Sequence, residues 1–212
     1  MFQFTLLRIP VRVEPFHWLI LAFLGAQFFG FNSRGDILNV LLFMVAGFFS
    51  ILVHEFGHAL TGRKFGAIGT QVVMHGMGGV AIFPQARFTR KQNFLVTAAG
   101  PGIQILLGLI AIGILTQLPK PHPAREFFSV IAYISIFWAV LNCIPVFPLD
   151  GRQMMSAILG PQREILTHQI SIGAAVVFGI LGLKLGFMFL PIFMGFMAYQ
   201  SWQFIQSRKQ RW

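Results

Sequence analysis

The feature that most constrains this chain is one long apolar stretch, Ile37–Leu60, in which Glu55 is the single charged residue. A helix of about 20 mostly apolar residues spans the hydrocarbon core of a bilayer. Apolar residues make up 56% of the 212 residues and charged residues only 10%, whereas soluble domains carry about 25% charged residues. The sequence therefore predicts an integral membrane protein with a carboxylate inside the membrane.

Similar apolar stretches recur along the chain and predict the other membrane spans. We place the spans near Phe16–Phe31, Ile37–Thr61, Phe94–Leu118, Phe127–Ile144, Ile165–Leu183 and Gly186–Phe204. The last two are kept separate because their joint stretch is too long for one crossing and is interrupted at Lys184–Gly186. The predicted fold class is an all-α polytopic membrane protein with about six transmembrane helices. We expect a single membrane-embedded domain over residues 1–212.

The positively charged residues indicate how these spans are oriented, because cytosolic loops of membrane proteins carry an excess of Lys and Arg. If the N-terminus is cytosolic, four of the 16 Lys and Arg residues lie outside, namely Arg34, Lys120, Arg125 and Lys184. The cytosolic side then holds Arg8, Arg12, Arg63, Lys64, Arg87, Arg90, Lys91, Arg152, Arg163, Arg208, Lys209 and Arg211. We therefore expect both termini in the cytosol and a location in the inner or plasma membrane. The net charge of +10 follows from this topology, so no nucleic-acid partner is expected.

The second predicted span contains the pattern H-E-x-x-H, formed by His54, Glu55 and His58. On a helix this spacing places two imidazoles one turn apart on the same face. Two neutral histidines at that spacing can bind one Zn²⁺, and the glutamate can accept a proton from the attacking water. Ionisable groups at bilayer depth are costly, which indicates that they serve a function. The single cysteine, Cys143, excludes a zinc cluster of several thiolates.

A second constellation follows the fourth span, where Asn142 and Asp150 flank a segment with two prolines three residues apart. Prolines interrupt helical hydrogen bonding, and irregular backbone at membrane depth must line a cavity or be buried in protein. His54 and Ile144 lie equally far along their predicted spans, so we expect Asp150 to reach His54 as the third ligand. The Asn142 amide could hold a substrate carbonyl or a developing oxyanion. Alternatively, Asp150 is a turn or helix cap and Asn142 satisfies broken backbone.

These two motifs together, H-E-F-G-H and N-x-x-P-x-x-P-L-D-G, resemble those of the site-2 protease family of intramembrane zinc metalloproteases. The segments Gly78–Ala81 and Ala99–Gly102 add to the resemblance, which covers a catalytic core of about residues 37–160 and suggests the compact subgroup. The resemblance implies one Zn²⁺ per chain, held by His54, His58 and Asp150, with Glu55 as the catalytic base. The PDZ and nucleotide-sensing domains known in the family have no counterpart here, so regulation by them is not expected.

Residues 69–84 read as a β-hairpin, because the β-branched runs Gln71–Met74 and Val80–Phe83 are separated by a glycine-rich turn. Ile9, Val11 and Val13 alternate with other residues and would add a strand. An exposed strand edge can hold an unwound substrate by main-chain hydrogen bonds. We therefore expect substrate to bind at Gly79, Val80, Ala81 and Ile82, on the cytosolic side. The alternatives are a purely structural hairpin, and a turn that brings His75 to the metal as a ligand.

The function predicted from these patterns is a zinc-dependent endopeptidase that cleaves membrane-spanning segments near the cytosolic side and releases a cytosolic fragment. Its expected partners are transmembrane protein substrates and the lipid bilayer. One alternative is a membrane zinc protease of another class, with Glu126 or Glu164 as the third ligand. Another is a metal permease, which would need polar residues distributed along several spans.

Overall fold

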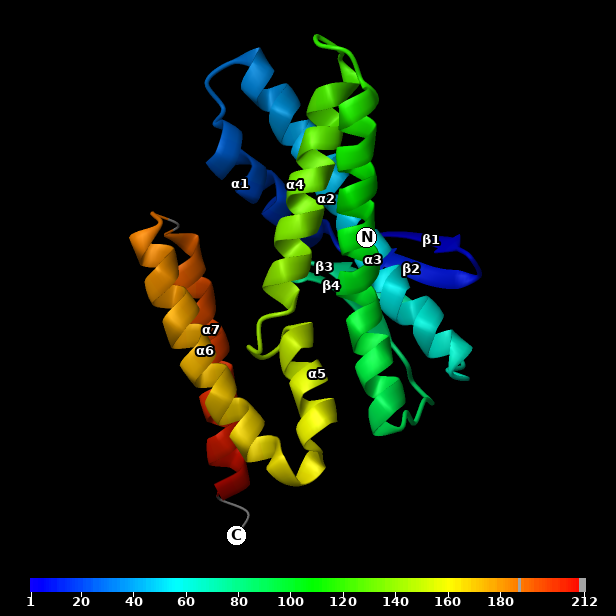
Figure 1. The fold of residues 1–212 in the computed structure, drawn as a ribbon, viewed down its shortest axis with the longest axis vertical. Helices are drawn as coiled ribbons and strands as arrows, with labels where there is room; N and C mark the ends of the chain where they lie inside the picture. The colour runs from blue at the N-terminus through cyan, green and yellow to red at the C-terminus, as the bar shows by residue number, and fades with distance from the viewer. Residues whose placement is uncertain (187, 210–212) are drawn as a thin grey trace. The chain divides into compact units, whose positions relative to one another are not determined.

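The computed structural model describes residues 1–186 and 188–209 (Figure 1). Long helices form at all of the predicted spans: α1 (Pro15–Phe29), α2 (Arg34–Lys64), α3 (Arg90–Gln117), α4 (Ala124–Asn142), α6 (Glu164–Lys184) and α7 (Phe189–Lys209). Of these, α2, α3, α4 and α6 are long and apolar enough to cross a membrane, and α1 is a shorter apolar helix. The predicted class of polytopic helical membrane protein is confirmed. Phe187 and Arg211, which entered the span and orientation predictions, lie outside the described residues.

Backbone contacts divide the chain into two compact units. The first unit contains residues 1–87 and 99–139, and the second contains residues 88–98 and those from 140 onward. Each unit has its own cluster of buried apolar side chains. The single domain expected from the sequence stays a prediction.

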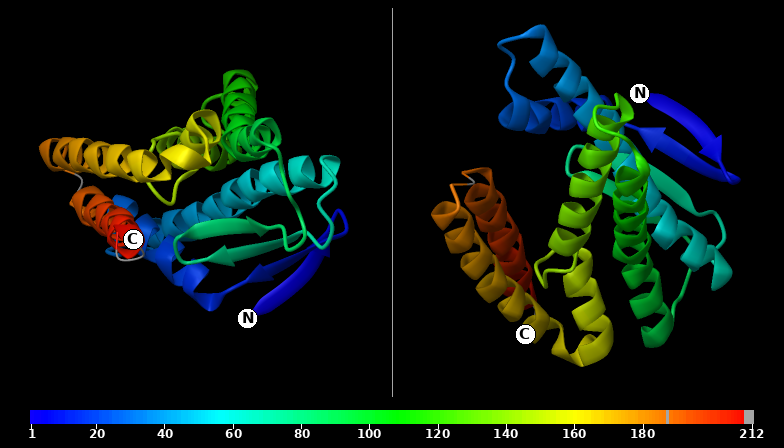
Figure 2. Two further views of the ribbon diagram at one scale, coloured as in Figure 1. Left: turned by 90° about the horizontal axis from the view of Figure 1, so that it is seen from below. Right: turned by 45° about the horizontal axis from the view of Figure 1, so that its top comes forward.

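The first unit contains a four-stranded mixed sheet in the order β1-β2-β3-β4, seen from two sides in Figure 2. The strands are β1 (Phe2–Leu6), β2 (Ile9–Val13), β3 (Gln71–His75) and β4 (Gly78–Ile82). The β1–β2 and β3–β4 pairs are antiparallel, whereas β2 and β3 are parallel. The predicted hairpin and the predicted strand at Ile9–Val13 are therefore confirmed. Strand β1 was not predicted, and β4 begins at Gly78 and ends before Phe83.

Helix α2 carries the H-E-x-x-H pattern, and its ends are well defined. At the start, the Ser33 side chain accepts a hydrogen bond from the Asp36 amide while Asp36 accepts from the Ser33 amide, which is a capping box. At the end, Arg63 and Lys64 place positive charge against the negative end of the helix dipole. The helix packs against β3 and β4, so the sheet lies beside the motif.

The second unit contains the end of α4 and the segment that follows it. The helix stops at Asn142, residues 143–149 are irregular, and helix α5 (Asp150–Leu159) starts at the predicted carboxylate. The prolines thus interrupt the helix as predicted, although α5 was not expected. A short 3-10 helix (Pro161–Arg163) leads into α6, which packs along α7 (Figure 1). The predicted interruption between them is confirmed, with Gly186 at a φ of +79°.

Candidate metal centre

His54 and His58 lie one turn apart on the inner face of α2, with only 4% and 8% of their surfaces exposed. Their Nε2 atoms are 3.0 Å apart. Two nitrogens bound at about 2.05 Å to one tetrahedral zinc ion are roughly 3.3 Å apart. The pair therefore fits a shared zinc ion with a movement of only a few tenths of an ångström.

A chain of buried polar side chains fixes the orientation of His54. Its Nδ1 lies 2.9 Å from Oε1 of Gln104, a residue on α3 with no exposed surface. The amide nitrogen of Gln104 donates to the Ser50 hydroxyl at 2.9 Å, and this hydroxyl pairs with Ser135 on α4 at 2.9 Å. Because the Gln104 amide nitrogen donates to Ser50, its oxygen accepts a hydrogen bond from Nδ1–H of His54. In this tautomer Nε2 is the unprotonated nitrogen, as in many histidine metal sites.

Gly100 on α3 is placed directly against both imidazoles. A Cβ atom added there would overlap the His58 ring and would lie 2.9 Å from Nε2 of His54. On the α2 side, a Cβ at Gly57 would lie 2.5 Å from the carbonyl oxygen of Ala99. The two glycines let α2 and α3 approach closely at the level of the histidines, which is the close helix packing that small residues permit in membranes.

Glu55 lies between the histidines in sequence, and only 4% of its surface is exposed. Its side chain is in contact with strand β4, because a Cβ atom built on Gly79 would be 2.5 Å from Glu55 Cγ and 2.8 Å from Oε1. The strand predicted to bind substrate is therefore next to the predicted catalytic base. Along β4, the Val80 and Ile82 side chains are 41% and 39% exposed.

The strand register and a hydrogen bond between Glu14 and Met74 show which backbone groups of β4 face its outer edge. Met74 is paired with Gly79, and its carbonyl accepts from the Glu14 amide on the opposite side of β3. In an antiparallel ladder, backbone groups alternate between the two edges. Gly79 and Ala81 therefore direct their amides and carbonyls away from β3, whereas Ile82 directs its own toward Gln71. Strand β4 ends the sheet order, so this outer edge has no strand partner among the described residues.

In the second unit, Asp150 is the first residue of α5 and only 7% exposed. Leu149 takes the N-cap position of α5, and Asp150 is the acidic residue of its first turn. Gly151 follows it against the carbonyl groups of Cys143 and Ile144, where a Cβ atom would overlap both. Asn142 is the last residue of α4 and is half-buried.

His75, the alternative ligand, is the last residue of β3, and its side chain contacts the turn of the same hairpin. Its Nδ1 accepts a hydrogen bond from the Met77 amide at 3.2 Å, and its carbonyl oxygen is 2.9 Å from His17 Nδ1. The imidazole is thus engaged in the hairpin turn.

Sequence reasoning missed Gln104, Ser50 and Ser135, although polar residues inside apolar spans were an available signal.

Comparison with known proteins relates the chain to zinc metalloproteases. The profile of Peptidase family M50 matches residues 120–183. A protein of Synechocystis sp. described as a candidate zinc metalloprotease is 29% identical over 196 residues, which are 86% of this chain and 50% of that protein. A zinc metalloprotease of Methanocaldococcus jannaschii is 21% identical over 93% of this chain and 59% of its own length. The chain therefore spans between half and three fifths of the length of these two relatives.

A solved structure, the site-2 protease from Methanocaldococcus jannaschii, has a similar fold. The TM-score is 0.70 at 20% sequence identity, and the match covers 95% of this chain and 94% of that chain. At this identity the likeness shows the fold alone.

Proposed function

This chain belongs to the site-2 protease family within Peptidase family M50, and we propose on this premise that it is a zinc-dependent intramembrane endopeptidase. The observation that carries the proposal is the buried pair of His54 and His58, whose Nε2 atoms are 3.0 Å apart on a helix long and apolar enough to span a membrane. Buried imidazoles at bilayer depth need such a functional explanation.

His54, His58 and Asp150 would hold the zinc ion, as the two sequence motifs predict. Each of these side chains is buried, and imidazole nitrogens and carboxylate oxygens are zinc ligands. Support comes also from the Gln104 contact, which places the proton of the His54 imidazole on Nδ1 and makes Nε2 the unprotonated nitrogen. A zinc ion bound there supplies a Lewis acid that polarises the scissile carbonyl and lowers the pKa of water toward about 7.

Glu55 would then act as the general base. A carboxylate buried beside the two histidines can accept the proton of the attacking water and return it to the leaving nitrogen. The Asn142 amide would donate a hydrogen bond to the carbonyl oxygen as negative charge develops on it. Glu55 lies within α2 and Asn142 is the last residue of α4, so both belong to regular helices, which suits groups that must be held still during reaction.

The outer edge of β4 would bind the substrate. A membrane-spanning helix hides its peptide bonds, so the segment to be cut must first be unwound and held in extended form. The outward amides and carbonyls of Gly79 and Ala81 can pair with such a segment as an added strand. Because Gly79 also contacts Glu55, a peptide bound there would lie near the catalytic base. Transmembrane proteins cut near the cytosolic side are therefore the proposed substrates, with both termini of this chain in the cytosol.

A protease of another zinc class would need a different acidic ligand. Glu164 is unsuited to that role, because its carboxylate pairs with Arg208 at 3.0 Å. Glu126 lies in the first turn of α4, far along the helix from the buried Ser135 that joins the histidine network. These observations favour Asp150 over either glutamate.

Cleavage of a model membrane-spanning peptide by the purified protein in detergent tests the function. We expect the zinc-loaded protein to cut the peptide and a zinc chelator to stop it. Glu55→Gln should keep its zinc and lose cleavage, because the carboxylate serves as a base and not as a ligand. Glu126→Gln is the matched control and should stay active. Loss of zinc in Glu55→Gln, or full activity of that variant, would contradict the assigned role.

A further inference from the structure

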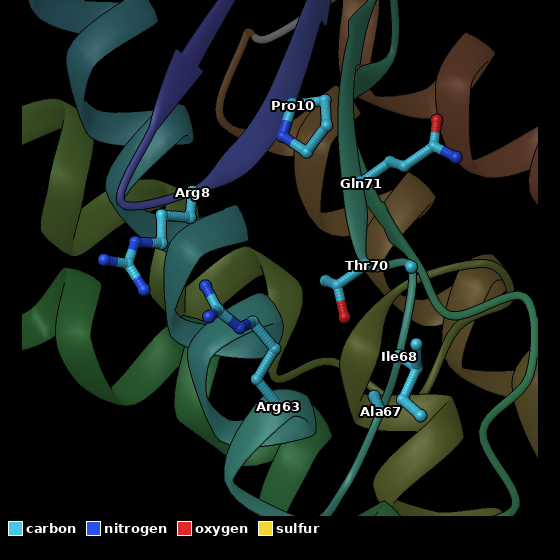
Figure 3. A pocket seen from close by; sticks show the side chains of 8 residues that line it. Arg8, Pro10, Arg63, Ala67, Ile68, Thr70 and Gln71 are labelled. Carbon is cyan, nitrogen blue, oxygen red and sulfur yellow. The ribbon is translucent and has the colours of Figure 1, made fainter.

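A polar pocket of about 420 Å³ opens in the first unit at the end of α2 (Figure 3). Arg63 in its lining lies about two helical turns beyond Glu55. Arg8, from the turn between β1 and β2, and Arg63, from the last turn of α2, extend their guanidinium groups into the same space (Figure 3). Two cations facing one pocket repel each other, so the arrangement calls for an anion.

No acidic side chain of the described residues balances this charge. Neither Arg8 nor Arg63 forms an ion pair with another described residue, and the pocket lining contains no carboxylate. Arg63 donates one hydrogen bond to the Leu7 carbonyl oxygen at 2.8 Å, which holds its side chain in place and leaves further guanidinium donors. The pocket thus presents fixed positive charge without a partner inside the described chain.

Thr70 gives independent evidence for a ligand. The residue lines the pocket and is only 6% exposed, yet its hydroxyl Oγ1 has no hydrogen-bond partner among the residues described. A buried hydroxyl without a partner is destabilising, so such groups are rare in native structures and call for an explanation. A ligand oxygen in this pocket would satisfy the hydroxyl together with the two guanidinium groups.

The turn between β1 and β2 links this pocket to an apolar one. Leu7 and Arg8 have φ angles of +50° and +61°, in a region where such turns normally use Asn or Gly. This strained turn places Arg8 at the polar pocket and Leu7 at an adjoining apolar cavity of about 490 Å³. The cavity is lined by Phe56, Leu60 and Ile103 among others. Strain of this kind is often kept for function.

Both cavities lie where a membrane-spanning helix emerges from the apolar core. Helix α2 is mostly apolar from Ile37 to Leu60 and ends at Arg63 and Lys64, residues typical of the headgroup level of a bilayer. We propose that the polar pocket binds the phosphate of an anionic phospholipid and that the adjoining apolar cavity receives part of an acyl chain. Arg8, Arg63 and Thr70 would bind the phosphate oxygens, and Leu7 would contact the chain.

The test is a lipid titration of the purified full-length chain in a non-ionic detergent, followed by native mass spectrometry. The probes are dioleoyl phosphatidylglycerol, the zwitterionic dioleoyl phosphatidylcholine, and inorganic phosphate. We expect phosphatidylglycerol to bind at least about tenfold more tightly than phosphatidylcholine, because only the former leaves its negative charge unbalanced. Inorganic phosphate should bind far more weakly than the lipid, because it leaves the apolar cavity empty.

Three variants separate specific binding from diffuse attraction. Arg8→Gln combined with Arg63→Gln should weaken phosphatidylglycerol binding about 25-fold, on the basis of roughly fivefold for each cation. The matched control, Lys64→Gln with Arg87→Gln, removes the same charge from outside the pocket and should change binding less than about threefold. Thr70→Val should weaken binding about tenfold without loss of folding, because the hydroxyl it removes has no partner in the described chain.

Several results would overturn the proposal. Equal losses in the two double variants would show diffuse attraction, and unchanged binding in Thr70→Val, verified as folded by its zinc content, would remove the pocket from the site. Inorganic phosphate that binds as tightly as the lipid would identify a site for free anions. Displacement of the lipid by a membrane-spanning peptide with a flanking acidic residue would assign the pocket to substrate instead.

Discussion

Replacing Gly100 by alanine tests whether α3 is held against the histidine pair. The added Cβ atom would lie 2.9 Å from Nε2 of His54 and would overlap the His58 ring. A carbon and a nitrogen in ordinary contact are about 3.4 Å or more apart, so the rings or the helix must move by at least roughly 0.5 Å. Metal–ligand distances in a zinc site vary by only about 0.2 Å. We therefore expect the zinc affinity of Gly100→Ala to fall at least about tenfold.

Gly102→Ala is the matched control, because nothing lies within 4 Å of the Cβ position at Gly102 on the same helix. Its zinc affinity should equal that of the unmodified protein, and its stability should be unchanged or slightly raised, since alanine is favoured over glycine in helices by about 1 kcal/mol. Zinc affinity can be measured by competition with a chromophoric chelator in detergent. If Gly100→Ala is folded and binds zinc as tightly as Gly102→Ala, the described packing of α3 on the histidines is wrong.

Three further predictions follow from the same geometry. Gln104→Met removes the acceptor for His54 Nδ1 and should lower zinc affinity about 10- to 100-fold. Gln104→Glu keeps an acceptor there and should lower zinc affinity less. Equal zinc affinities of the two variants in a chelator titration would refute this role of Gln104. Ala81→Pro removes an outward amide of β4 and should reduce cleavage of a membrane-spanning substrate while zinc stays bound. Ile82→Pro breaks the pairing with β3 and should lower the stability of the protein as well. A fully active Ala81→Pro variant would exclude substrate docking at this edge. In a Cys143→Ser background, an impermeant thiol reagent added to intact cells should label a cysteine at Ser33 and not one at Gln85, and the reverse pattern would invert the proposed orientation.

The membrane-spanning helices and the unwound segment after Asn142 could be predicted because their signals are local. A run of apolar residues fixes where a helix can cross a bilayer, and Pro145 and Pro148 interrupt one wherever they occur. The H-E-x-x-H pattern is likewise read within one helical turn. These features need no knowledge of what packs against them.

Features that depend on packing between elements could not be predicted in the same way. The contact from Ser135 through Ser50 and Gln104 to His54 joins three helices, and its existence depends on how each helix is rotated. Strand β1 was missed because its hairpin turn contains neither Asn nor Gly, the usual signal for such a turn. The outward direction of the Ala81 amide follows from strand register, which only the structure supplies.

The zinc X-ray absorption spectrum of the purified, zinc-loaded protein tests the central claim most directly. We predict two imidazole nitrogens at about 2.0 Å with oxygen in the remaining positions and no sulfur. The spectrum of His75→Ala should be the same, and that of Asp150→Ala should change with loss of bound zinc. A spectrum that loses an imidazole in His75→Ala, or that is unchanged in Asp150→Ala, would contradict a zinc site formed by His54, His58 and Asp150.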